Sequence, residues 1–126
     1  MKGSIVLAIV IVASWAAGLS AQDSANVAGR YLEEKNKITI EVYREGAGYA
    51  AKQIDVLDPK KKKDNGKLIA KDMIAVGNTL TGTVISTTNG KEYRASWELS
   101  NDRSSLALKI KFGFLSFSDT WKRVDP

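Results

Sequence analysis

The chain has 126 residues, of which 44% are hydrophobic and 26% are charged, and it contains neither cysteine nor histidine. This composition is typical of one globular domain and excludes the disordered and the disulfide-stabilised classes. Without thiolate or imidazole groups the common zinc sites, cysteine nucleophiles and histidine bases are excluded as well. We therefore expect no metal site, no cofactor and no enzymatic activity.

The first segment has the pattern of a secretory signal peptide. Lys2 precedes a predominantly apolar run over residues 5–17, and Ser20 and Ala21 offer small residues at its end. As a helix, this run would measure about 20 Å, which is shorter than the hydrocarbon core of about 30 Å. We predict a signal peptide over residues 1–21 and a single domain over 22–126. The mature protein is then periplasmic or secreted, with no stable membrane insertion after cleavage.

The formal net charge is +5, and a run of four lysines accounts for much of it. The run lies between Asp58-Pro59 and Asp64-Asn65-Gly66, which are turn-forming residues, so it predicts a mobile, solvated loop. Nucleic-acid binding calls for basic residues spread over a face with interleaved aromatics, so we expect no nucleic-acid partner. The alternative for the run is contact with an anionic surface such as lipopolysaccharide. The basic loop consists of Lys60, Lys61, Lys62 and Lys63.

Apolar and polar residues alternate strictly in the segments 37–43, 93–99 and 106–112. A period of two residues with one apolar face is typical of antiparallel strands. Weaker alternation in other segments brings the prediction to eight strands, and no helix of useful length is expected after the signal peptide. The predicted strands cover residues 27–33, 36–43, 49–57, 68–76, 79–87, 91–99, 105–112 and 114–124.

The connections between these strands are short, except for the segment 58–67. Short connections make consecutive strands neighbours in the sheet, which gives a meander. An eight-stranded meander has two exposed edges unless it closes on itself. We predict an all-β fold, an eight-stranded antiparallel up-and-down β-barrel of lipocalin-like type. An open sheet or a small sandwich is the alternative.

Large residues on the apolar faces of three predicted strands are expected to point into the barrel. An eight-stranded barrel is either filled by such side chains or holds one small ligand. We predict a small apolar ligand, because these positions offer only Tyr and Trp as hydrogen-bonding side chains. The alternative is a filled barrel that serves as a structural or protein-interaction module of the cell envelope, including an inhibitor of a secreted enzyme. The candidate ligand-binding residues are Ile38, Ile40, Val42, Tyr93, Trp97, Leu106, Leu108, Ile110 and Phe112.

The first and last strands carry a pattern that resembles the calycin barrels, the superfamily of lipocalins and fatty-acid-binding proteins. Gly29 and Tyr31 stand where that superfamily has Gly-x-Trp, and Trp121 and Arg123 stand near the end of the last strand. The resemblance implies that these four residues close the barrel, with the Arg123 guanidinium stacked on the Tyr31 ring within about 6 Å.

The order of short motifs along the mature chain resembles the exported bacterial family called domain of unknown function 2147. The resemblance implies an exported lipocalin-like barrel whose role is unassigned. The motifs are Gly29-x-Tyr31, Ile38-x-Ile40, Tyr49 to Ile54, Leu80-x-Gly82, Gly90-Lys91-x-Tyr93, Leu106-x-Leu108, Gly113-Phe114 and Trp121-x-Arg123.

Overall fold

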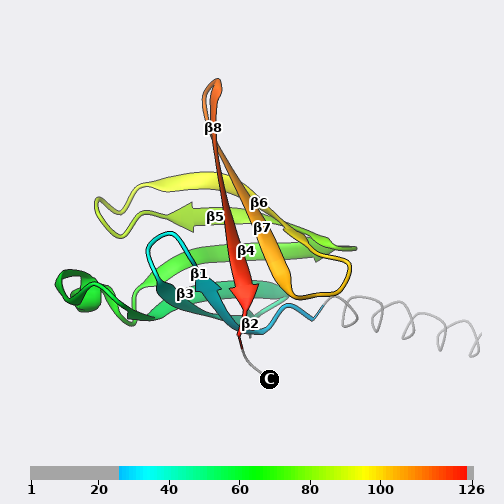
Figure 1. The fold of residues 1–126 in the computed structure, drawn as a ribbon. Helices are drawn as coiled ribbons and strands as arrows, with labels where there is room; N and C mark the ends of the chain where they lie inside the picture. The colour runs from blue at the N-terminus through cyan, green and yellow to red at the C-terminus, as the bar shows by residue number, and fades with distance from the viewer. Residues whose placement is uncertain (1–25, 125–126) are drawn as a thin grey trace, which may run out of the picture.

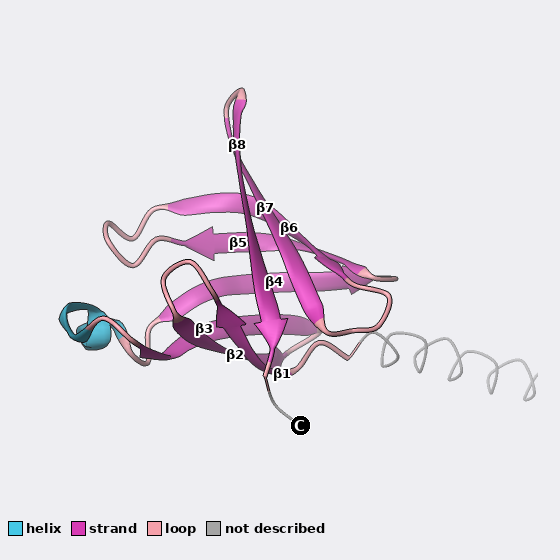
Figure 2. Ribbon diagram, in the orientation of Figure 1, coloured by secondary structure: helices cyan, strands magenta, loops and turns pink. Residues whose placement is uncertain are grey.

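The computed structural model describes residues 26–124, and the predicted signal peptide lies outside these residues. The described part of the chain forms eight strands and one short 3-10 helix (Figures 1 and 2). No helix within residues 26–124 has the length and apolar character needed to cross a membrane. The elements are β1 (Gly29–Glu33), β2 (Ile38–Glu45), β3 (Gly48–Val56), η1 (Pro59–Asp64), β4 (Leu68–Val76), β5 (Thr79–Ile85), β6 (Glu92–Leu99), β7 (Ser105–Phe112) and β8 (Leu115–Arg123).

The strands form a closed barrel in which each one pairs antiparallel with the next in sequence. The barrel closes through β1 and β8, with Tyr31 opposite Arg123 and Glu33 opposite Trp121. Closure leaves no sheet edge that runs the length of the barrel, so the unpaired edge strands of an open meander are avoided. The predicted up-and-down barrel is confirmed, and the open-sheet and sandwich alternatives are wrong.

Alternation along the strands separates an apolar interior from a polar exterior. In β7, Leu106, Leu108 and Ile110 are buried, whereas Lys109 and Lys111 between and beyond them are exposed. The first strand begins at Gly29, later than predicted. Val27 precedes it as a fully buried residue at one end of the barrel.

The lysine run forms η1, where the sequence analysis predicted a loop. The Asp58 carboxylate accepts a hydrogen bond from the Lys60 backbone N–H at 3.0 Å, and Pro59 occupies the first turn. An Asp cap followed by proline favours the start of a helix, because both satisfy the constraints of its first turn. The side chains of all four lysines, Lys60, Lys61, Lys62 and Lys63, are exposed.

Specific contacts join η1 to the barrel, so the predicted loop is in fact a short helix held against β3. Lys62 Nζ lies 2.8 Å from Asp55 Oδ1 and 2.8 Å from the Val56 carbonyl oxygen on β3. The buried Gln53 side chain donates through Nε2 to Asn65 Oδ1 at 3.0 Å. The segment between β3 and β4 is therefore tied to β3 from within η1 and from the residue that follows it.

The β7–β8 hairpin extends beyond its neighbours, as Figure 1 shows at the top of the barrel. On one side, the pairing of β6 with β7 ends at Ala95 opposite Ile110. On the other side, the pairing of β1 with β8 ends at Glu33 opposite Trp121. We call the part that projects furthest, residues 111–118, the hairpin tip.

Candidate ligand-binding site

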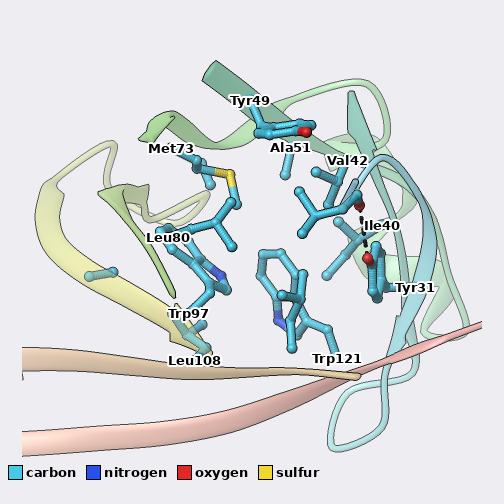
Figure 3. Packing of buried hydrophobic residues seen from close by; sticks show 14 of the residues in the cluster. Tyr31, Ile40, Val42, Tyr49, Ala51, Met73, Leu80, Trp97, Leu108 and Trp121 are labelled. Carbon is cyan, nitrogen blue, oxygen red and sulfur yellow. Dashed lines mark hydrogen bonds between the residues drawn. The ribbon is translucent and has the colours of Figure 1, made fainter. Parts of the chain in front are cut away.

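The barrel has two different ends. The closed end carries the segment 26–28 and the turns after β2, β4 and β6, whereas the open end carries the turns after β1, β3, β5 and β7. Large side chains fill the closed half. Trp97 is fully buried there, with its ring 6.0 Å from the buried Trp121 ring (Figure 3).

Arg123 binds the closed end together. Its guanidinium carbon lies 5.3 Å from the centroid of the Tyr31 ring, so the expected cation–π contact is present. Its Nη2 also donates to the Ala28 carbonyl oxygen at 2.6 Å. The Tyr31 hydroxyl in turn donates to the Val27 carbonyl oxygen at 2.8 Å, which holds the segment before β1 across this end (Figure 3).

A cavity of about 350 Å³ occupies the open half of the barrel. This volume lies near the lower limit for small-molecule sites, which measure about 300 to 1,000 Å³. Apolar side chains from five strands form most of its wall. These are Ile38, Ile40, Ile69, Val84, Ile85, Leu108, Ile110, Phe117 and Trp121.

The nine predicted ligand-binding residues fall into three groups. Ile38, Ile40, Leu108 and Ile110 line the cavity. The structure places the other five elsewhere. Val42, Trp97 and Leu106 are buried without lining the cavity, whereas Tyr93 and Phe112 pack edge to face on each other with ring centroids 4.7 Å apart.

Phe112 does not point into a closed interior, and this part of the prediction is wrong. Its side chain is 39% exposed. It follows the alternation of Leu108 and Ile110 and shares their face of β7. The strand has left the barrel by this point, however, because β6 pairs with β7 only as far as Ile110.

Polar side chains also line the cavity, and they lie outside the three strands whose inward positions were expected to offer only Tyr and Trp. Glu33 on β1 is 3% exposed, and Asp119 on β8 lies diagonally across the β1–β8 pair from it. Gln53 on β3 also lines the wall, but its amide is engaged by the η1 segment. Glu33 and Asp119 are the chemically distinctive groups of the cavity.

The two carboxyl groups interact with each other. Burial raises the pKa of Asp119 to about 6, and a hydrogen bond to Glu33 together with the charge of Glu33 adds to this rise. Two carboxylates at close range repel each other unless one is protonated or a cation lies between them. This wall of the cavity therefore places two carboxyl groups close together, with Lys35 as the cation that acts on Asp119.

The backbone holds Glu33 in place at the start of the β1–β2 turn. Its two carboxylate oxygens accept hydrogen bonds from the backbone N–H groups of Lys35 and Asn36, each at 2.9 Å. The Lys35 side chain supplies a cation beside the pair. Its Nζ donates to the Ser118 carbonyl oxygen at 3.1 Å and lies 4.8 Å from the Phe117 ring centroid, and its charge partly offsets the rise in the pKa of Asp119. Within residues 26–124, no three side chains of the metal-ligating types gather into a cluster.

The barrel is similar to that of a protein of known structure. This is HP1028 from the human pathogen Helicobacter pylori, which belongs to the lipocalin family; the two share 20% sequence identity and align with a TM-score of 0.66 over 79% of this chain and 83% of that chain. The likeness shows the lipocalin-like fold alone. No protein-family model and no curated protein sequence matches the chain. The resemblance to the domain of unknown function 2147 therefore remains a prediction from the sequence.

Proposed function

We propose that the barrel binds a small molecule in the cavity at its open end. The observation that supports this most is the cavity itself, an apolar hollow of about 350 Å³ whose wall also carries the Glu33 and Asp119 carboxyl groups. Apolar walls with a few placed polar groups are characteristic of ligand sites, in which the polar groups fix orientation and specificity. A barrel filled by its own side chains is the alternative.

The two carboxyl groups favour a ligand with an apolar body and a positively charged or N–H-bearing end. A protonated amine between Glu33 and Asp119 would relieve the repulsion between the two carboxylates by donating to both. A carboxylate ligand such as a fatty acid would add a third negative charge to the same wall. We therefore propose that the ligand is an apolar amine and not an apolar acid. This is a narrower class than the small apolar ligand expected from the sequence.

We also propose that the protein acts by binding, without catalysis, outside the inner membrane. The absence of Cys and His from the sequence supports the first statement, and the signal-peptide pattern of residues 1–21 supports the second. The N-terminal sequence of the protein recovered from an exporting bacterial host tests the location. A chain that begins after Ala21 in the periplasm or medium is expected, and an uncleaved cytoplasmic chain would contradict it.

A matched pair of ligands tests the proposed site. We expect an adamantyl amine to bind more tightly than an adamantyl carboxylate in isothermal titration calorimetry above the pKa of Asp119. The two probes share one apolar body, so a difference in affinity reports the charge of the wall. Asp119→Asn should remove most of the preference for the amine and leave the binding of uncharged adamantane derivatives in place.

A second test of the proposed site fills the cavity with a bulky side chain. Val84 lines the cavity, and Val84→Trp should abolish the binding of every probe. Val76 is 76% exposed on β4 and does not line the cavity, so Val76→Trp should bind probes like the wild type. If the wild type binds no probe, the ligand-binding proposal fails and the filled-barrel alternative gains support.

A further inference from the structure

All three phenylalanines of the chain lie within the hairpin tip, and none of them is buried. Phe112 is 39% exposed, Phe114 is 97% exposed and Phe117 is 40% exposed, and Leu115 between the last two is 60% exposed. A single exposed apolar residue is ordinary, but a contiguous apolar patch on a soluble domain marks a contact surface. The hairpin tip therefore has the character of a contact surface, one that is buried when the protein binds a partner.

The hairpin tip extends past the backbone ladders of the strands that flank it. Tyr93 contacts it at Phe112, and Lys35 contacts it at Ser118 and Phe117. Neither β6 nor β1 pairs with it, because their ladders end at Ile110 and Trp121 respectively. The turn itself is tight, with Gly113 at a φ of +62°, a conformation that glycine adopts without strain. Figures 1 and 2 show the tip as the part of the hairpin furthest from the other strands. The hairpin tip can therefore be transferred from water to an apolar environment without unfolding of the barrel.

The charge next to the tip is positive. Residues 104–118 contain Lys109 and Lys111 and no acidic residue. Both lysines point away from the barrel interior and, together with Arg94 on β6, line an outer hollow of about 190 Å³. Three cations around one hollow favour an anionic group such as a phosphate ester.

We propose that the β7–β8 hairpin docks the protein on an anionic phospholipid bilayer, with the aromatic tip in the interface and the basic hollow against the lipid headgroups. The spacing fits this arrangement. At about 3.3 Å per residue, Lys111 lies about 7 Å from Gly113 along the strand. A headgroup layer is about 5 to 7 Å deep, so Lys111 lies at the level of the phosphates when the tip meets the acyl chains. Lys109 lies about 13 Å from Gly113, on the aqueous side of that layer.

The bilayer explains both halves of the surface better than a protein partner does. Phenylalanine and leucine enter the boundary of the acyl chains, and basic residues are attracted to anionic headgroups. The tip also adjoins the ligand cavity, because Phe117 lines it. Docking would turn the open end of the barrel toward the bilayer, although the proposal does not depend on what the cavity binds.

Vesicle flotation tests the proposal. We expect the exported protein to bind vesicles of phosphatidylcholine and phosphatidylglycerol in equal parts at least about tenfold more tightly than vesicles of phosphatidylcholine alone, and to be released by salt. Phe114→Ser combined with Leu115→Ser should weaken binding at least about tenfold, since each change removes an apolar side chain from the interface. Every variant is compared with a wild-type chain that has the same N-terminus, so a retained apolar segment 5–17 contributes equally to both.

Matched controls separate the hairpin from other apolar and basic surfaces. Leu57 and Val76 are 72% and 76% exposed outside the hairpin, and changing both to Ser should leave vesicle binding unchanged. Lys109→Ser with Lys111→Ser should weaken binding about tenfold or more, because each lysine near an anionic surface contributes about fivefold. The same change at Lys60 and Lys61 in η1 should have little effect. If the η1 pair matters and the hairpin pair does not, the proposal is overturned.

A local reporter gives an independent measurement. The described tryptophans Trp97 and Trp121 are buried, so the fluorescence of Phe114→Trp is distinguishable as a difference from the wild type. We expect its emission to shift to the blue on binding and to be quenched by lipids brominated near the headgroup. Unchanged emission of this folded variant in the presence of vesicles would overturn the proposal. So would a dimer that depends on Phe114 and Leu115 in a protein that binds no vesicles.

Discussion

Arg123 lies over the Tyr31 ring, 5.3 Å from its centroid, at the point where the last strand pairs with the first. The same guanidinium donates to the carbonyl oxygens of Ala28, Asn26 and Arg103, which belong to the segment before β1 and to the turn before β7. One side chain thus joins three parts of the chain at the closed end. Because these contacts lie where the barrel closes, their loss should affect the whole fold.

Arg123→Ala should lower the free energy of unfolding by about 2 kcal/mol, since it removes a cation–π contact and charge-assisted hydrogen bonds. Arg123→Lys should recover only part of the loss, because an ammonium group cannot reach several carbonyl oxygens as the planar guanidinium does. Urea denaturation measures both. Arg30 is exposed on β1, and Arg30→Ala should stay within about 0.5 kcal/mol of the wild type. Equal effects at the two arginines would contradict the role of Arg123.

Two aromatic residues predicted to share one role differ in their environment. Trp97 is fully buried in the closed half, so Trp97→Ala should create a void and cost about 3 to 5 kcal/mol. Phe112 is 39% exposed and contacts Tyr93, so Phe112→Ala should cost about 1 kcal/mol or less. Thermal or urea unfolding of the two variants compares them directly. A loss of several kcal/mol for Phe112→Ala would show that the hairpin tip is integral to the core.

The alternation of residues was enough to predict the strands, and the short connections between them were enough to predict their order and the closure of the barrel. It places Ile40, Leu108 and Ile110 on the inner face, where the structure has them buried. Alternation shows which face of the sheet a side chain lies on, but it does not show where along the barrel axis the side chain lies. It therefore could not distinguish Trp97, which fills the closed half, from Phe112, which has passed the end of the β6–β7 ladder.

The acidic pair was predictable in principle. Glu33 follows Tyr31 at a spacing of two on β1, and Asp119 precedes Trp121 at the same spacing on β8. The period of two places both carboxyl groups inside. Their charge instead predicts that both carboxyl groups face the solvent, because ionised groups are costly to bury. The structure resolves the conflict through backbone N–H donors to Glu33 and through the raised pKa of Asp119.

The four lysines of η1 should contribute unequally to stability. Lys62 bonds to Asp55 and to the Val56 carbonyl oxygen, and the lowered pKa of Asp55, caused first by its hydrogen bond to Lys62, reflects this contact. Lys62→Ser should lower the thermal midpoint, whereas Lys60→Ser should leave it unchanged. Scanning calorimetry at low and high salt compares the two variants. A salt-independent loss at both positions would show that the fold depends on the lysine stems and not on the ion pair.

Ionisation of Asp119 should make the barrel less stable as pH rises. Its pKa is raised from 3.8 to about 6 in the folded protein, chiefly by burial and then by Glu33. A raised carboxyl pKa means that the folded state holds this proton more tightly than the unfolded state does. Its contribution to stability is therefore complete below about pH 4 and is lost as pH rises through about 6. The carboxyl is partly solvated, so we expect a loss of about 1 kcal/mol, less than the full shift would give.

Asp119→Asn isolates this effect, because the amide keeps the size of the side chain and does not titrate. Relative to the wild type, the variant should gain about 1 kcal/mol between about pH 4 and pH 7, as measured by urea denaturation at each pH. Asp102→Asn is the matched control. The pKa of Asp102 is lowered to about 2 by hydrogen bonds from Ser104 and Ser100, so its protonation acts below that window. The control should differ from the wild type by a constant amount across the window. A constant difference for Asp119→Asn as well would mean that Asp119 does not hold a proton against Glu33, and the expected preference of the cavity for an amine would lose its electrostatic basis.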